Sequence, residues 1–102
     1  MSTQLHTIQR ITIYTATGLA TSLLKSLRDL GSKGYTIVEA RGKGDQGTVE
    51  DPFTLSTHVR IEVLVQPAVA EKITNYIATL ISHRQSIAFT LEDVKVINPT
   101  HF

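Results

Sequence analysis

The stretch HVRIEVLVQP, residues 58–67, has the clearest pattern in the chain and decides the fold prediction. Every second residue is a β-branched aliphatic, and these side chains share one face: Val59, Ile61, Val63, Val65. The opposite face carries Arg60, Glu62 and Leu64. This alternation predicts a strand with one buried face. Pro67 suits the first turn of a helix, which we predict to run to about Ile81.

The same criteria predict three more strands and a second helix. The strands lie at 7–15, 35–41 and 86–97, and the helix at about 18–31, with Thr15 or Thr17 as its N-terminal cap. Its apolar residues form one stripe at helical spacing: Leu19, Leu23, Leu24, Leu27, Leu30. Gly31 and Gly34 mark the helix end, where glycine suits the left-handed cap. Residues 98–102, NPTHF, are predicted to be a loose tail.

The predicted order β-α-β-β-α-β defines the fold class. It indicates an α+β, ferredoxin-like single domain over residues 1–102, with a four-stranded antiparallel sheet and two helices on one face. The other face of the sheet is left without helices, and we expect Ile8, Leu64 and Phe89 there. A small protein seldom leaves a large apolar face open to water, so a closed oligomer is expected.

Composition excludes several classes of protein. A net charge of +1 over 102 residues argues against a nucleic-acid partner. The absence of cysteine excludes disulfides, iron–sulfur sites and thiolate zinc, and fits a reducing compartment. No apolar run approaches the roughly 20 residues that span a bilayer, and no signal peptide is visible. We therefore expect a cytoplasmic protein.

Enzymatic and metal-binding patterns are weak. No cysteine nucleophile or G-x-S-x-G motif is present, and the adjacent acids at 50–51 and 92–93 suit solvated charges better than an acid–base pair. The histidines have no metal-ligand spacing: His6, His58, His83, His101. The sequence predicts neither an enzyme nor a metal site.

Residues 42–57 form a long segment without periodicity, and its glycines leave two interpretations open. GKGDQG, residues 42–47, lacks the phosphate-loop spacing. It fits a turn that needs positive φ. It also fits backbone N–H groups of Gly42 and Gly44 that approach an anion, with Arg41 or Lys43 adding charge.

A larger pattern includes this glycine cluster. KGYTIVEARGKGDQG, residues 33–47, resembles the second strand and T-loop root of the PII signalling family, typically G-M-T-V-T-E-V-R-G-F-G-R-Q-x-G. VRIEVLVQP, residues 59–67, resembles the strand that follows the loop in that family. The resemblance extends over residues 8–97.

The resemblance implies a homotrimer that binds nucleotide in clefts between subunits. It makes loop 42–57 the T-loop, which contacts a target that is often a membrane transporter or an enzyme. Thr36 matches the position that contacts adenine, Leu64 a strand position whose backbone contacts the base, and Gln46 a position used for Mg and 2-oxoglutarate. The positions that wrap the phosphates are matched by Gly42, Lys43, Gly44, Asp45.

Departures from the family pattern point to the divergent PII-like branch, such as carboxysome- or bicarbonate-transporter-associated members. The Gly- and Lys-rich B-loop is replaced by ISHRQ, residues 81–85, and the paired arginines of the last strand by Val96 and Asn98. The remaining cations that could face a phosphate are Arg41, Lys43, Arg84. We therefore expect AMP or ADP rather than ATP as ligand, with no obligatory cofactor. Arg84 equally fits a solvated charge at a helix end.

Two alternatives share the fold. A CutA-like trimer would be a metal-linked or structural protein, and His58 and His83 would then be the residues to test. A small ferredoxin-like enzyme is disfavoured because no nucleophile or acid–base pair is visible.

Overall fold

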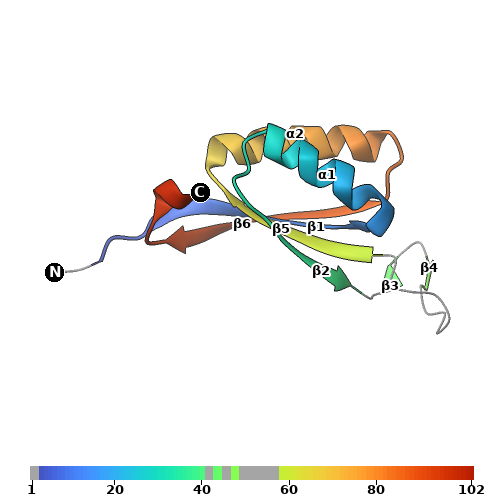
Figure 1. The fold of residues 1–102 in the computed structure, drawn as a ribbon, viewed down its shortest axis with the longest axis horizontal. Coiled ribbons are helices and arrows are strands. Elements are labelled where there is room, and N and C mark those ends of the chain that lie inside the picture. The colour runs from blue at the N-terminus through green and yellow to red at the C-terminus, as the bar shows by residue number, and fades with distance from the viewer. Residues whose placement is uncertain (1–2, 41–42, 45–46, 49–57) are drawn as a thin grey trace.

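The computed structural model describes residues 3–40, 43–44, 47–48 and 58–102. Two helices lie on one face of an antiparallel sheet (Figure 1). The elements are β1 (His6–Ala16), α1 (Thr17–Asp29), β2 (Thr36–Ala40), β3 (Lys43–Gly44), β4 (Gly47–Thr48), β5 (His58–Val65), α2 (Pro67–Ser82), β6 (Ile87–Val96) and the short 3-10 turn η1 (Pro99–His101). The predicted ferredoxin-like fold is confirmed.

The main sheet has four strands in the order β2-β5-β1-β6. Within it, Ile13 of β1 pairs with Ile61 of β5 on one side and with Phe89 of β6 on the other. Ile37 of β2 pairs with Ile61 at the opposite edge. This register aligns apolar residues of all four strands on the face toward the helices.

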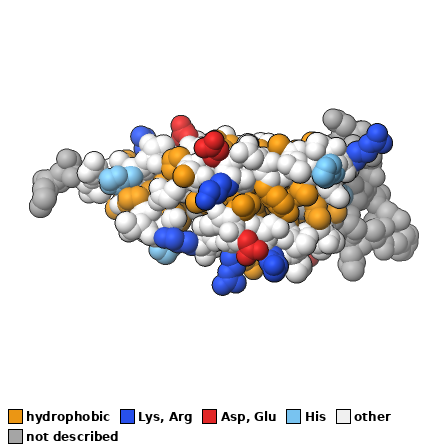
Figure 2. All heavy atoms as spheres, turned by 90° about the horizontal axis from the view of Figure 1, so that it is seen from above, with side chains coloured by type: hydrophobic (Ala, Val, Ile, Leu, Met, Phe, Trp, Pro, Cys, Tyr) orange, Lys and Arg blue, Asp and Glu red, His pale blue; other side chains and the backbone are white. Residues whose placement is uncertain are grey.

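The hydrophobic core lies between that face and the helices. Its sheet residues are Ile11, Ile13, Val59, Ile61, Val63 and Val65, and its helix residues are Ala20, Leu23, Leu27, Ala70, Ile73 and Ile77. Each large aliphatic side chain buried in this way contributes about 1.5–3 kcal/mol. From the helix side, further apolar side chains form a band along the middle of the molecule (Figure 2). Tyr76 of α2 donates a 3.0 Å hydrogen bond to Ser26 Oγ of α1, which joins the two helices.

The face without helices is more polar than predicted. Phe89 packs against the core, because its pairing with Ile13 places it on the helix side, so the prediction for Phe89 is wrong. Ile8 is fully buried, and Leu64 is half-buried. In the same row across the sheet as Leu64, Arg10 and Glu92 form an ion pair, with 3.0 Å between Nη2 and Oε2. This pairing cannot be read from a strand pattern taken alone.

The sequence predicts the C-terminal end of α1 correctly but not its N-terminal cap. Ala16 precedes the helix and no side chain caps it, so neither Thr15 nor Thr17 is the cap. The Thr15 hydroxyl donates instead to the Ser86 carbonyl, at 3.4 Å. Gly31 has φ +121 and its N–H bonds to the Arg28 carbonyl at 3.0 Å, so the predicted glycine cap is confirmed at Gly31 and not at Gly34.

The C-terminal segment is held rather than loose. Residues 99–101 form η1, which contacts β1. Gln66 Nε2 donates to the Pro99 carbonyl at 2.7 Å, and Lys33 Nζ donates to the Thr100 carbonyl at 3.1 Å. The prediction of a loose tail is therefore wrong, because two side chains distant in sequence attach it to the domain.

Neither α1 nor α2, nor any other helix in the described part of the chain, combines the length and the apolar character needed to cross a membrane.

Candidate functional site

A recess of about 430 Å³ lies where β2 begins, where β5 ends and where the C-terminal segment returns to the domain. We call it the Thr36 recess. Its lining residues are Lys33, Gly34, Tyr35, Thr36, Glu62, Leu64, His101 and Phe102. Two residues that the sequence predicts for a nucleotide site, Thr36 and Leu64, therefore meet in one place.

Strand register explains how the floor of the recess forms. Thr36 pairs directly with Glu62, so their side chains lie side by side on the face away from the helices. Leu64, two residues further along β5, lies on the same face because strand side chains alternate. Gly34 precedes the strand, and a Cβ there would meet no atom within 4 Å.

Charges of both signs border the recess. Glu62 supplies a carboxylate, and Lys33 supplies an ammonium that is bonded to the tail. The pKa of Arg10 is raised above its usual value, chiefly by its hydrogen bond to Glu92 and the charge of that carboxylate, and to a smaller extent by the charge of Glu62.

The lining has the chemistry to hold a flat, polar ring system. His101 and Phe102 supply aromatic surfaces, while Thr36 and Glu62 supply a hydroxyl and a carboxylate. Aromatic rings pack against planar bases, and a carboxylate accepts hydrogen bonds from hydroxyl or amino groups. A nucleoside offers all of these partners.

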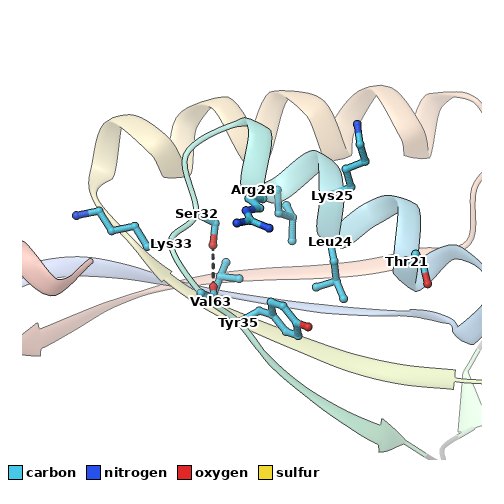
Figure 3. A pocket seen from close by; sticks show the side chains of 10 residues that line it. Thr21, Leu24, Lys25, Arg28, Ser32, Lys33, Tyr35 and Val63 are labelled. Carbon is cyan, nitrogen blue, oxygen red and sulfur yellow. Dashed lines mark hydrogen bonds between the residues drawn. The ribbon is translucent and has the colours of Figure 1, made fainter.

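A second, larger groove of about 690 Å³ lies on the other side of segment 33–35, which forms one wall of the Thr36 recess. Lys33, Gly34 and Tyr35 line both hollows. In this groove, between α1 and β2, Leu24 points down from the helix toward the sheet and the Tyr35 ring lies beneath α1 (Figure 3). The Ser32 hydroxyl donates a hydrogen bond to the Gly34 carbonyl at 2.8 Å, which stabilises the backbone segment that lines both hollows.

Arg84 lies at the opposite end of the domain from the Thr36 recess. It follows α2, just before β6 begins at Ile87, and Ile87 pairs with Thr15 near the end of β1. The same end of the sheet holds His58 and Ala40, which pair with each other. At ~3.3 Å per residue, His58 and Leu64 are separated by roughly 20 Å along β5. One chain therefore does not bring Arg84 to Thr36.

The Arg84 backbone is in the left-handed region, with φ 66. Its N–H bonds to the Ile81 carbonyl at 3.0 Å, and the Gln85 N–H bonds to the Leu80 carbonyl at 3.1 Å. This is the helix-end motif in which glycine is the usual residue. An arginine at this position has a backbone cost of roughly 1–2 kcal/mol.

The predicted phosphate-binding positions are only partly described. Lys43 and Gly44 form β3, which pairs with β4 so that Lys43 lies opposite Thr48 and Gly44 opposite Gly47. They follow β2, at the same end of the sheet as Arg84. Arg41, Gly42, Asp45 and Gln46 lie outside the described residues, as does most of loop 42–57.

Six lining residues were missed by sequence reasoning: Lys33, Gly34, Tyr35, Glu62, His101, Phe102. The alternation of β5 already placed Glu62 on the same face as Leu64, so that residue could have been found. His101 and Phe102 carried no signal. Among the described residues, no group of three or more His, Asp or Glu side chains could hold a metal ion.

Comparison with known proteins identifies the family and the fold. The family model of the nitrogen regulatory protein P-II matches residues 8–101. A proposed PII-like signalling protein from Thermus thermophilus has 26% identity and a TM-score of 0.80, over 97% of this chain and 98% of that chain. No curated protein matches the sequence.

Further solved structures have the same fold at lower identity. CPII, a nitrogen regulatory PII-like protein from Thiomonas intermedia K12 bound to ADP, AMP and bicarbonate, has 21% identity and a TM-score of 0.89, over 99% of this chain and 98% of that one. Its apo form has 19% identity and a TM-score of 0.74, over 91% of this chain and 95% of that one. Because the P-II family model matches most of its length, the chain belongs to the nitrogen regulatory protein P-II family.

Proposed function

We propose that this protein is a non-enzymatic signalling protein that binds AMP or ADP in clefts between the subunits of a homotrimer. Occupancy of the cleft would alter loop 42–57 and so regulate a target, such as a membrane transporter. A ligand can shift the loop only by binding one loop state more tightly than the other.

The proposal rests on the distance, within one chain, between the residues of the recess and the candidate phosphate-binding residues. Thr36, Glu62 and Leu64 line the recess at one end of the sheet, whereas Lys43 and Arg84 belong to the other end. A single nucleotide could contact both groups only if the recess of one copy meets the opposite end of a second copy. Such a head-to-tail contact closes into a ring when the rotation allows it. We propose a ring of three copies, as the resemblance to PII proteins implies.

The lining of the Thr36 recess supports a nucleoside as the part held there. The aromatic residues can pack against the base, and Glu62 can accept hydrogen bonds from the ribose hydroxyls. CPII, which has the same fold, is described as bound to ADP and AMP. An adenine nucleotide is therefore the ligand we propose.

The cations favour a short phosphate chain. Residues 83–86, HRQS, contain one arginine and no lysine. Phosphate groups are usually held by several Arg or Lys side chains or by backbone N–H groups. With Arg41, Lys43 and Arg84 as the cations that the sequence offers for the phosphates, we expect one or two phosphates to be held, and ATP to bind no better than ADP.

Isothermal titration with AMP, ADP, ATP and cyclic AMP tests the proposal, with and without bicarbonate. We expect saturable binding of AMP and ADP at one site per chain. Thr36→Val should weaken both by roughly 2- to 10-fold, because one hydrogen bond is lost. Thr90→Val is the matched control, since Thr90 lies in the same row at the other edge of the sheet. Absence of binding at millimolar nucleotide would refute the nucleotide part.

The oligomeric state is a separate test. Light scattering after size exclusion should give three times the 11.2 kDa of one chain. A monomer at micromolar concentration would contradict the proposed cleft, because the two groups of residues could not then meet.

A further inference from the structure

The wall of the Thr36 recess includes the C-terminal turn. His101 and Phe102 line it together with Glu62 and Leu64, although the strand pattern ends before them at Val96. Their two rings meet edge to face, with centroids 4.9 Å apart and an interplanar angle of 84°. The arrangement presents two aromatic surfaces at right angles beside a carboxylate.

The turn is fixed by bonds to its backbone. Gln66 and Lys33 donate to the carbonyls of Pro99 and Thr100, at 2.7 and 3.1 Å. The His101 and Phe102 N–H groups bond within the turn, to Asn98 and Pro99 carbonyls at 3.0 and 3.2 Å. Because these bonds use main-chain groups, the position of the two rings is set without using their own surfaces.

We propose that His101 and Phe102 are specificity-determining residues of the Thr36 recess and contact the nucleoside half of the bound nucleotide. The Phe102 ring packs against the base, and the His101 imidazole lies beside the ribose. This inference rests on the proposed function and adds to it. The C-terminal turn selects the nucleoside, while Lys43 and Arg84 of a second copy face the phosphates.

A purely structural role for the turn makes a different prediction. η1 contacts β1, whose Ile8 is fully buried but lies outside the main core cluster. If Phe102 served only as apolar cover, leucine would replace it without effect on ligand binding. Phe102→Leu therefore keeps an apolar side chain and removes the aromatic face.

A tryptophan reporter tests the contact directly, because the chain has no tryptophan. The fluorescence emission of the Phe102→Trp variant should change when AMP is added. The midpoint of this change should match the midpoint that titration calorimetry gives for the same variant. Ile97→Trp is the matched control: residue 97 is 66% exposed, lies on the same terminal segment and is not among the lining residues. Its emission should not change.

Affinity measurements complete the test. Loss of an aromatic–base contact weakens binding roughly 5- to 100-fold. We expect each variant, Phe102→Leu and His101→Ala, to weaken the binding of AMP and of ADP by the same factor, since both ligands contain the same nucleoside. The ratio of the two affinities should stay at the wild-type value.

The outcomes separate this inference from the proposed function. If the wild-type protein binds no nucleotide, the proposed function fails and this inference with it. If the wild type binds but Phe102→Leu binds equally well and the reporter is silent, the inference alone is overturned. Tighter binding by the variants would also overturn it, because the turn would then obstruct the recess, and so would unequal effects on AMP and ADP.

Discussion

Lys33 and Thr100 are 67 positions apart in the chain, yet the Lys33 ammonium donates a 3.1 Å hydrogen bond to the Thr100 carbonyl oxygen. Lys33 belongs to the connection between α1 and β2, and Thr100 to η1. The bond joins two walls of the Thr36 recess. The shape of the recess thus depends on an interaction between segments that no local pattern connects.

Replacing Lys33 by methionine should loosen η1. The methionine keeps the apolar stem but cannot donate to Thr100. We expect amide hydrogen exchange at His101 and Phe102 to accelerate several-fold, with a loss of global stability below about 1 kcal/mol, because the bond is exposed. NMR-detected exchange measures this. Lys72→Met on the exposed side of α2 is the control, and equal exchange rates in the two variants would show that the bond does not hold the turn.

Arg84 allows backbone strain to be separated from ligand binding. Arg84→Gly and Arg84→Ala both remove the guanidinium, but only glycine relieves the left-handed conformation at φ 66. We expect the glycine variant to be more stable than the alanine variant by about 1 kcal/mol in urea unfolding. Both should weaken ADP binding to a similar extent. Identical stabilities would indicate that this backbone position carries no strain.

Gly31 should tolerate no side chain. Its φ is +121, and an added Cβ would lie 3.0 Å from Val69 Cγ2. We expect Gly31→Ala to destabilise the protein by about 1–3 kcal/mol. Gly18→Ala is the control, because a Cβ at Gly18 meets nothing within 4 Å and alanine favours the helix. Urea unfolding at fixed protein concentration compares the two, and a neutral Gly31→Ala would contradict the geometry.

The centre of the core should be sensitive to lost volume. Ile61 is fully buried and pairs with residues of two neighbouring strands, Ile13 and Ile37. Ile61→Ala should cost about 2–5 kcal/mol and Ile61→Val about 0.5–1.5 kcal/mol. Ile97→Ala, at an exposed position, should change the free energy of unfolding by less than about 0.5 kcal/mol. Thermal or urea unfolding gives these values, and equal costs at positions 61 and 97 would place the core elsewhere.

The two helices and the four strands of the main sheet could be predicted because their signals are local, whereas β3, β4 and η1 were not predicted. The alternation in 58–65 and the leucine stripe of 18–31 each require only neighbouring residues, and both elements occur within a residue or two of the predicted bounds. Gly31 was predictable for the same reason, since a helix end needs a residue that accepts positive φ.

Three other errors involve partners distant in sequence. Phe89 faces the core because β6 pairs with β1 in a register that its own pattern does not specify. Thr15 does not cap α1 because its hydroxyl bonds to Ser86 instead. The C-terminal residues look polar and irregular, but Lys33 and Gln66 fix them from other elements.

The candidate site was predictable only in part. The resemblance to PII proteins indicated Thr36 and Leu64, and the structure brings the two together in the Thr36 recess. Lys33 and the C-terminal rings could not be found, because their place in the recess depends on long-range bonds. Arg41, Gly42, Asp45 and Gln46 remain predictions from the resemblance.

The most direct test of the central claim is an AMP titration followed by the backbone amide shifts of isotope-labelled protein. We predict saturable shifts at Gly34, Thr36, Glu62, Leu64 and Phe102, which line the Thr36 recess. Tyr76, between the two helices, should not shift. A spectrum unchanged at millimolar AMP, or shifts that avoid the residues of the recess, would contradict the account.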